Sequence, residues 1–330
     1  MDVGNRAKQE QLPRGLGRGK DMQIINSVCK MVLKVVLLAA IFSCNLQAVT
    51  LNKNIVKSNG HPMALWHKQP DGKFDRSKQI LLLHGRTWSS LPDFDLQVDG
   101  EELSLMDNLV KLGFSVWALD ARGYGETPRD KSGWNTPNKA AEDVANIVGW
   151  ITKMTGEKPT VFGWSYGSMM AQLMVQQNPN LAKAVILYGY PIDPEEKVTV
   201  SIVQSRHPLK EKNTAKNAES DFITPNSISQ KAIDTYVTAS LKADPYRADW
   251  NQLLQWDQLD ASKIKIPLLL LQAEHDPLAN SESHARFFVR LPNANKQWVV
   301  LAGGDHAALL ETSKDRLVHS VNDFVEWLER

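Results

Sequence analysis

The sequence predicts an α/β fold in which helices flank a mostly parallel sheet. Short apolar runs alternate along the chain with segments of helical periodicity, which is typical of strands joined by crossover helices. Several of the apolar runs are followed directly by residues with reactive side chains. In an open parallel sheet such residues gather at the carboxyl edge, where ligands bind. The composition, 42% hydrophobic and 23% charged, fits a globular protein with a sizeable core.

Net charge and cysteine content narrow the class of function. The formal net charge is +1, so there is no overall electrostatic attraction for nucleic acid. Both cysteines, Cys29 and Cys44, lie near the N-terminus, so the folded part is predicted to hold no disulfide and no thiolate metal site. The histidines have no companions at metal-ligand spacing. We therefore expect no metal site, and the sequence does not indicate an oligomeric state.

Residues 1–48 are predicted to be a leader that precedes the fold. Residues 1–30 contain scattered glycines and charges without an apolar period. The apolar run Val35–Phe42 then follows a lysine, and it is too short for a helix that crosses a bilayer but typical of a signal peptide. Because the segment before this run is long for a signal peptide, we expect translation to begin at Met22 or Met31.

Two ways of processing the leader remain open. Residues Ile41-Phe42-Ser43-Cys44 resemble a bacterial lipoprotein box, and cleavage there would leave Cys44 lipidated and attached to a membrane. Alternatively, a signal peptidase would cut after Ala48. In either case we expect an exported protein that is periplasmic, secreted or lipid-anchored.

The strands are predicted from apolar runs that turn residues bound. Residues 51–69 are expected to form two antiparallel strands at a sheet edge, joined at Asn59-Gly60. Gln79–Leu83 is predicted to be a buried central strand, since His84-Gly85 follows it directly. The remaining strands are predicted at Phe114–Leu119, Thr160–Phe162, Ala184–Gly189, Ile266–Leu271 and Gln297–Leu301.

Helices are predicted where apolar residues recur with a period near 3.6. Gly113 and Gly156 follow two of these segments and mark their ends. The last segment is amphipathic and closes the chain. The predicted helices are Leu103–Leu112, Pro137–Thr155, Tyr166–Gln177 and Arg316–Leu328.

Residues 192–262 interrupt the alternation and are predicted to form a helical lid. The segment contains no convincing strand, and a helix is predicted at Ser227–Leu241 with Ser227 and Gln230 as a capping box. Because the insert falls between two sheet strands, we expect it to lie over their carboxyl ends. The predicted organisation is a leader at 1–48 and an α/β domain at 49–330, with the lid at 192–262 inserted within that domain.

The stretch Gly163-Trp164-Ser165-Tyr166-Gly167 lies between a predicted strand and a predicted helix. A serine becomes a useful nucleophile when a sharp turn holds its hydroxyl out beside a base. In such a turn the residues two before and two after the serine lie close against neighbouring backbone. Glycine has no side chain to clash there, which accounts for Gly163 and Gly167. A Gly/Ser-rich turn that matches by chance is the alternative, so the residues after the other strands decide between the two.

An acidic residue and a histidine follow later strands, in the order Ser…Asp…His. Asp276 lies just after the strand Ile266–Leu271, and His306 follows the last strand. His306 would accept the serine proton and deliver it to the leaving group, while the carboxylate would hold the imidazole and stabilise its charged form. Glu274 is the alternative carboxylate, and Asp305 is expected to form hydrogen bonds within its own loop.

A tetrahedral intermediate also requires donors for its oxyanion. One donor is expected to be the backbone N–H of Tyr166, directly after the nucleophile. The second is expected from the loop after the strand Gln79–Leu83, where Gly85 allows a tight turn and the N–H of Arg86 would point inward. Thr87 is the alternative donor.

Taken together, the motifs resemble those of the α/β-hydrolase superfamily. They are, in the order of that superfamily, His84-Gly85, Asp120-x-Arg122-Gly123-x-Gly125, Gly163-x-Ser165-x-Gly167, Asp276-Pro277 and Gly304-Asp305-His306. The resemblance covers Leu51–Arg330 and implies a mostly parallel eight-stranded sheet, a cap domain at the position of the insert and no cofactor. Serine at 165 departs from the branches similar to haloalkane dehalogenases or epoxide hydrolases, which use an aspartate nucleophile. Arg86 stands where many members carry a small or apolar residue.

The first functional hypothesis is a serine hydrolase that cleaves a carboxylic ester of a small molecule through an acyl-enzyme. Aromatic residues of the insert and of the loops near the site would then favour a partly apolar substrate, although the same residues would also suit packing between the lid and the body. The candidate pocket residues are Trp88, Trp164, Tyr236, Trp250 and Trp256.

Two other functions remain open. An aminopeptidase or amidase would need acidic residues to hold a substrate amine, and Glu195 and Glu196 are the only adjacent acidic pair in the insert. A non-catalytic ligand binder on the same scaffold is the third hypothesis. The presence of Ser165, Asp276 and His306 argues against it, because a binder does not need all three.

Overall fold

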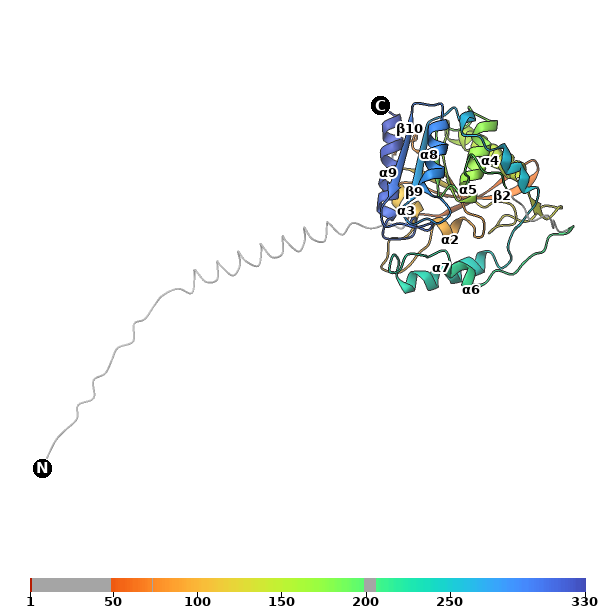
Figure 1. Ribbon diagram of the computed structural model, residues 1–330. Helices are drawn as coiled ribbons and strands as arrows, with labels where there is room; N and C mark the ends of the chain where they lie inside the picture. The colour runs from red at the N-terminus through yellow and green to blue at the C-terminus, as the bar shows by residue number, and fades with distance from the viewer. Residues whose placement is uncertain (2–48, 73, 199–205) are drawn as a thin grey trace. The chain divides into compact units, whose positions relative to one another are not determined.

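A sheet of eight strands lies at the centre of the protein (Figure 1). The computed structural model describes Met1 and residues 49–72, 74–198 and 206–330. The strands lie in the spatial order β1-β2-β4-β3-β6-β7-β9-β10. The pairs β1/β2 and β2/β4 are antiparallel, and every pair from β4 across to β10 is parallel. The predicted mostly parallel sheet is therefore confirmed.

The parallel strands of this sheet correspond to apolar runs in the sequence, whereas β1 is mostly polar and exposed at the edge. The strand β9 begins two residues later than predicted, after Pro267, whose nitrogen has no hydrogen to donate to a neighbouring strand. The strands are β1 (Asn52–Ser58), β2 (His61–Lys68), β3 (Gln79–Leu83), β4 (Ser115–Leu119), β6 (Thr160–Trp164), β7 (Val185–Tyr188), β9 (Leu268–Ala273) and β10 (Lys296–Leu301).

The predicted leader lies outside the described residues. This holds for the lipidation site at Cys44, for the cleavage site after Ala48 and for both candidate start residues. Within the part of the chain that the structure describes, no helix combines the length and the apolar character needed to cross a membrane.

Helices cover both faces of the sheet, and each face has its own hydrophobic core. The side chains of β3 alternate between the two, with Ile80 and Leu82 in one core and Leu81 and Leu83 in the other. The first core contains residues of α2 (Ser90–Phe94), α3 (Leu105–Lys111) and α9 (Lys314–Leu328). The second core contains residues of α4 (Pro137–Thr155), α5 (Tyr166–Gln177) and α8 (Ser281–Arg290).

The helices α4 and α5 have the bounds that the sequence predicts. The side chain of Thr136 accepts a hydrogen bond from the N–H of Lys139 at the start of α4, and Gly156 ends that helix with φ of 86°. The helices α2 and α8, and α6 (Ala215–Glu219) in the insert, were not predicted.

The insert between β7 and β9 forms a cap that contains α6, α7 (Gln230–Ala243) and two 3₁₀ helices, η1 (Leu253–Gln258) and η2 (Ala261–Lys263). Figure 1 shows α6 and α7 side by side, beyond α2. The predicted capping box at Ser227 is wrong, because the N-cap of α7 is Ser229, whose side chain accepts from the N–H of Ala232. Two short strands were also missed, since β8 (Asp249–Trp250) pairs with β5 (Trp134–Asn135) outside the main sheet.

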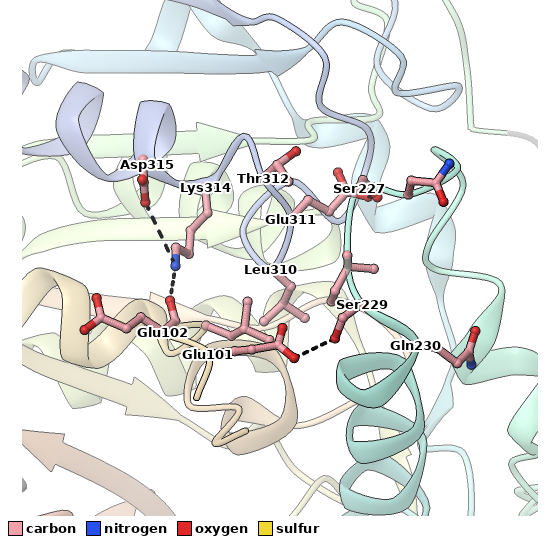
Figure 2. Close-up of a pocket in the computed structure, with 13 residues that line it drawn as sticks. Glu101, Glu102, Ser227, Ser229, Gln230, Leu310, Glu311, Thr312, Lys314 and Asp315 are labelled. Atoms are coloured by element: carbon pink, nitrogen blue, oxygen red, sulfur yellow. Dashed lines mark hydrogen bonds and ion pairs between the residues drawn. The ribbon is translucent and has the colours of Figure 1, made fainter. Parts of the chain in front are cut away.

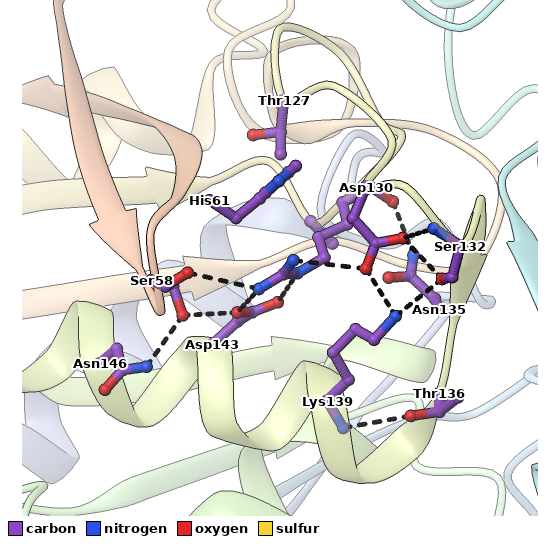
Figure 3. A network of polar contacts seen from close by, with 12 residues as sticks. Ser58, His61, Thr127, Asp130, Ser132, Asn135, Thr136, Lys139, Asp143 and Asn146 are labelled. Carbon is purple, nitrogen blue, oxygen red and sulfur yellow. Dashed lines mark hydrogen bonds and ion pairs between the residues drawn. The ribbon is translucent and has the colours of Figure 1, made fainter.

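A partly buried ion-pair network fixes the loop after β4 (Figure 3). The guanidinium of Arg122 donates to both carboxylate oxygens of Asp143 on α4, each at 2.6 Å. Ser58 at the end of β1 donates to the same carboxylate, and Lys139 on α4 donates to Asp130 at 2.6 Å. The bidentate pair gives this loop a defined geometry where it approaches the carboxyl edge of the sheet.

Candidate active site

Ser165 occupies a strained turn between β6 and α5. Its φ is 55° and its ψ is −119°, a backbone conformation that residues other than glycine rarely adopt. A Cβ on Gly163 would lie 2.2 Å from the carbonyl oxygen of Gly167, and a Cβ on Gly167 would lie 2.1 Å from the carbonyl oxygen of Leu83. Both glycines are therefore required by close contacts between backbones, as the sequence predicts for a nucleophile-bearing turn.

His306 and Asp276 form a buried hydrogen-bonded pair. Nδ1 of His306 lies 2.8 Å from Oδ2 of Asp276, and the Asp276 side chain is fully buried. The other carboxylate oxygen of Asp276 accepts from the N–H of Leu278 at 2.9 Å, so the carboxylate is held from both sides. Glu274, the alternative, is half exposed and accepts instead from the N–H of Gly303.

The serine and the histidine pair lie in one small region of the fold. Trp164, the residue before the serine, donates its indole N–H to the carbonyl oxygen of His306 at 2.8 Å. A Cβ on Gly189, just after β7, would lie 3.0 Å from Cε1 of His306 and 3.3 Å from Oδ2 of Asp276. The structure therefore places His306 and Asp276 in direct contact, and it places the residue before Ser165 in contact with the backbone of His306.

The loop that carries His306 is fixed by buried polar groups. The hydroxyl of Tyr188 donates to the carbonyl oxygen of Asp305 at 2.7 Å and accepts from the N–H of Ala308 at 3.0 Å. The N–H of Asp305 donates to the carboxylate of Glu311 at 3.3 Å. Tyr188 and Glu311 were not predicted as parts of the site, because their contribution depends on contacts between segments that lie far apart in the sequence.

The loop after β3 approaches the serine closely. A Cβ on Gly85 would lie 3.7 Å from Cβ of Ser165. Burial lowers the pKa of His84 to about 4, so the ring is neutral. Its Nε2 accepts from the N–H of Ala121 at 3.0 Å, which leaves Nδ1 to donate to the carbonyl oxygen of Gly85 at 2.8 Å. His84 thus anchors the loop rather than taking part in proton transfer.

Arg86 and Tyr166, whose N–H groups are the expected oxyanion donors, lie against each other. The guanidinium carbon of Arg86 lies 5.1 Å from the centre of the Tyr166 ring, within cation–π range. The carbonyl oxygen of Arg86 accepts from the hydroxyl of Tyr124. This bond orients the peptide between Arg86 and Thr87, which carries the N–H of Thr87, whereas the N–H of Arg86 shares a peptide with the Gly85 carbonyl that His84 holds. The charged side chain of Arg86 is exposed.

Most of the aromatic residues expected to line the substrate pocket are buried. Trp256 packs edge-on against Tyr166, with 5.8 Å between ring centres. Trp250 is partly buried and also packs edge-on against Tyr166, at 5.3 Å. Of the two alternatives left open for these residues, their burial favours packing, because large rings gain most when they are removed from water. The buried members of the set are Trp88, Trp164, Tyr236 and Trp256.

Glu195 and Glu196, the acidic pair expected near the lid entrance, do not form an amine-binding cluster. Glu195 is half exposed and accepts a hydrogen bond from Arg290 of α8 at 2.8 Å. Glu196 is exposed. Besides Asp276, the acidic residues near His306 include Asp305 and Glu311 of its own loop and Asp221 of the cap, which lies far from them in the sequence.

A pocket of about 680 Å³ lies beside this region, between the start of α7 and the segment before α9 (Figure 2). Its lining includes Glu311, which accepts from the hydroxyl of Ser227 at 2.6 Å. Burial raises the pKa of Glu311 to about 7, and the hydrogen bond from Ser227 opposes that rise. None of the residues that line this pocket belongs to the predicted triad.

Replacement of Glu311 by glutamine is expected to change how stability depends on pH. A raised pKa means that folding takes up a proton between the ordinary pKa of 4.5 and the value of about 7. The free energy of unfolding of the wild type should therefore fall as the pH rises through this window. In Glu311→Gln that fall should be smaller by roughly 1–3 kcal/mol between pH 5 and pH 8.

Chemical denaturation at several pH values measures this difference. The matched control is Glu282→Gln, on an exposed part of α8, which should leave the pH dependence unchanged. Parallel curves for the wild type and Glu311→Gln would contradict the prediction.

Comparisons with known proteins agree with this fold. The family described as serine aminopeptidase, S33, has a model that matches residues 77–313. The human protein serine hydrolase BPHL is 30% identical over 125 residues, a match that covers 37% of this chain and 38% of the human protein. In that match the chain spans less than two fifths of the length of its curated relative.

Two solved structures have similar folds. The serine hydrolase CarC, involved in carbazole degradation, superposes with a TM-score of 0.60 at 14% identity, over 84% of this chain and 100% of that one. The carboxylesterase CesB from Bacillus subtilis superposes with a TM-score of 0.57 at 18% identity, over 84% of this chain and 92% of that one. At these identities the similarity shows the fold alone.

Proposed function

This chain belongs to the α/β-hydrolase family described as serine aminopeptidase, S33, and we propose that it hydrolyses carboxylic esters of small molecules through a Ser165–His306–Asp276 triad. It is a serine hydrolase in the broad sense that the family and its relatives support. The ester specificity and the residue roles are the proposal. One observation carries it, namely the strained turn at Ser165 beside the buried hydrogen bond between His306 and Asp276.

The proposed reaction has two halves. Ser165 Oγ attacks the carbonyl carbon of the ester while Nε2 of His306 takes the hydroxyl proton, and the alcohol leaves with that proton. Asp276, hydrogen-bonded to Nδ1, keeps Nε2 available as the acceptor and stabilises the imidazolium. Water then attacks the acyl-enzyme in the same manner and releases the acid. The N–H groups of Tyr166 and Arg86, or Thr87 in place of Arg86, are the proposed donors to the oxyanion.

A burst experiment with a neutral chromogenic ester tests this proposal. If the acyl-enzyme forms faster than it is hydrolysed, p-nitrophenyl acetate should release about one equivalent of p-nitrophenol before steady turnover. A folded protein that releases no p-nitrophenol from a panel of short and medium acyl esters would contradict the proposal, and the non-catalytic binder would then be favoured.

A second candidate function, hydrolysis of substrates that carry an amine, is favoured by Asp221 of the cap. Its Oδ2 accepts from the indole N–H of Trp88 at 3.0 Å and lies 3.2 Å from the hydroxyl of Tyr236. The same hydroxyl lies 3.0 Å from Asp93. Burial raises the pKa of Asp93 well above its usual range, and the single hydrogen of the Tyr236 hydroxyl can be donated to Asp93 or to Asp221.

One oxygen of Asp221 is thus anchored while the other remains available. No residue that the structure describes donates a hydrogen bond to Oδ1 of Asp221, which is only partly buried. Burial raises the pKa of Asp221 to about 6, and the nearby His306 opposes that rise. Above pH 6 the carboxylate is therefore charged beside the proposed base, where it would attract a substrate ammonium group.

Asp221→Asn is expected to distinguish the two candidates. For an α-aminoacyl ester, the variant should lose about 10- to 100-fold in kcat/KM, the equivalent of one charge-assisted hydrogen bond. The N-acetylated form of the same ester should be unaffected. The wild type should lose its preference for the amine as the pH falls below about 6, because the carboxylate then takes up a proton.

Steady-state kinetics on the ester pair make this measurement. Asp234→Asn, on the exposed part of α7, is the matched control and should change neither rate. Equal effects of Asp221→Asn on both esters would exclude recognition of the amine and leave the neutral ester as the proposed substrate.

We also propose that the protein is exported, because of the apolar segment before Val49. The product would be either lipid-anchored at Cys44 or released after Ala48. Mass spectrometry of the mature N-terminus distinguishes a lipidated Cys44 from an N-terminus at Val49, and an unprocessed N-terminus would contradict export.

A further inference from the structure

A short segment of the cap, residues 221–227, contacts both loops of the proposed active site. We call it the strap. At its start, the carboxylate of Asp221 accepts from Trp88, in the loop that follows Arg86. At its end, Ser227 donates to Glu311 and its carbonyl oxygen accepts from the N–H of Thr312 at 2.9 Å. The strap therefore joins the oxyanion loop to the loop that carries His306.

Between these ends, the strap is tied to Asp305, the residue next to His306. Oδ2 of Asp305 accepts from the N–H of Ile223 at 3.0 Å and from the N–H of Thr224 at 2.6 Å. Oδ1 accepts from the N–H of Ala307 at 2.9 Å, on the other side of His306. Asp305 is fully buried, so one carboxylate with no exposure to solvent holds both the cap backbone and the backbone around the base.

The three hydrogen bonds require a carboxylate in particular. The oxygens of an ionised carboxylate can accept from all three backbone N–H groups, because neither oxygen carries a hydrogen. An asparagine has a single acceptor oxygen, and its amide nitrogen would face an N–H donor whichever way the amide is turned. Asparagine at 305 would therefore keep either the bond within the histidine loop or the bonds to the strap, but not both.

We propose that Asp305 is a positioning residue that couples docking of the cap to the placement of His306. The proposal rests on the function proposed above, since it assigns His306 as the base. When the strap is docked, its two N–H groups hold Oδ2, and Oδ1 then holds the peptide after His306. When the strap is undocked, Oδ2 loses both partners and the histidine loop loses its contact with the cap. A cap that closes over a substrate would thereby also complete the catalytic arrangement.

Asp305→Asn tests the proposal in the full-length protein. We expect kcat for p-nitrophenyl acetate to fall about 10- to 100-fold, the scale of the loss when a catalytic group is displaced by about 1 Å. The rate of labelling by a small fluorophosphonate should fall by a similar factor, because labelling depends on the same base. Hydrogen exchange at the amides of Ile223 and Thr224 should accelerate, which a loss of global stability alone would not confine to these amides.

The matched control is Asp249→Asn, another carboxylate that accepts from two successive cap N–H groups, those of Leu209 and Lys210. Asp249 also pairs with Arg129, so it ties the cap to the body without contacting the histidine loop. We expect both rates of this control to stay within about twofold of the wild type, since His306 keeps its supports.

A second variant keeps the proposal falsifiable if Asp305→Asn does not fold. Ser227→Ala removes the hydrogen bond between the strap and Glu311 and leaves Asp305 unchanged. It should lower both rates about threefold or more, the equivalent of one hydrogen bond. Full rates in every folded variant would overturn the coupling. If fluorophosphonate does not label the wild type, the proposed function is overturned as well. If the wild type is labelled and every variant is fully active, only the coupling is overturned.

Discussion

Replacement of Ser165 by alanine is expected to lower the rate of ester hydrolysis at least about 10³-fold, because the acyl-enzyme can no longer form. The free energy of unfolding should change little. Alanine and serine have similar difficulty in adopting the φ of 55° at this position, so the strain of the turn is retained. Steady-state hydrolysis of p-nitrophenyl acetate and chemical denaturation measure the two quantities.

The matched control for this substitution is Ser320→Ala on α9. The Ser320 side chain is partly exposed and its hydroxyl donates only to the carbonyl oxygen of Arg316 within the same helix, so both activity and stability should remain close to those of the wild type. A Ser165→Ala variant that keeps a tenth or more of the wild-type rate would place the nucleophile elsewhere.

Replacement of Gly167 by alanine is expected to destabilise the fold by more than about 3 kcal/mol, or to prevent folding altogether. In an ordinary helix this change would be favourable, since alanine is the better helix former. Here the new Cβ would lie 2.1 Å from the carbonyl oxygen of Leu83 in β3, and a backbone oxygen in a central strand cannot move aside. Gly163→Ala should behave in the same way, because its Cβ would lie 2.2 Å from the carbonyl oxygen of Gly167.

Gly149→Ala is the matched control, since the same change is made within the helix α4. Outside the backbone of its own helix turn and its two chain neighbours, no atom lies within 4 Å of a Cβ built on Gly149, and its backbone conformation suits any residue. The variant should be more stable than the wild type by about 0.5–1 kcal/mol. Denaturant unfolding of the three variants compares them directly. A folded Gly167→Ala protein with wild-type stability would show that the contact with β3 is not as close as described.

The regular core of the fold could be predicted because local signals and packing agree. The helix α4 has a capping threonine before a proline at its start and a glycine after its end, so both of its bounds could be predicted. The strand β3 is buried on both faces, which makes its sequence a continuous apolar run rather than an alternating one. The nucleophile turn also depends on local constraints, and these act on Gly163 and Gly167.

Tertiary contacts decided the features that sequence reasoning missed. The helix α7 begins at Gln230 because Ser229 caps it, while Ser227, an equally suitable cap by sequence, is engaged by Glu311 from the far end of the chain. The helices α2 and α6 have only five residues each, too few to show a period. Asp221 is separated by more than 80 residues from His306, so its place near the base could not be inferred from spacing.

The role of the aromatic residues also could not be predicted from the sequence. Trp88, Trp256 and Tyr236 are large apolar side chains near a predicted site, and such residues suit either a substrate pocket or a buried interface. Their sequence neighbours do not distinguish the two. In the structure, the hydroxyl of Tyr236 and the indole of Trp88 both find carboxylate partners, which makes the packing role possible for groups that carry a polar atom.

The central claim, that Ser165 is an activated nucleophile, is tested most directly by locating a covalent label. Purified protein would be treated with a fluorophosphonate, digested and analysed by mass spectrometry, beside the His306→Ala variant. The account predicts one label per chain, on Ser165, and labelling of the variant at least about 10²-fold slower. Absence of a label from the folded wild type, or a label on a different serine, would contradict it.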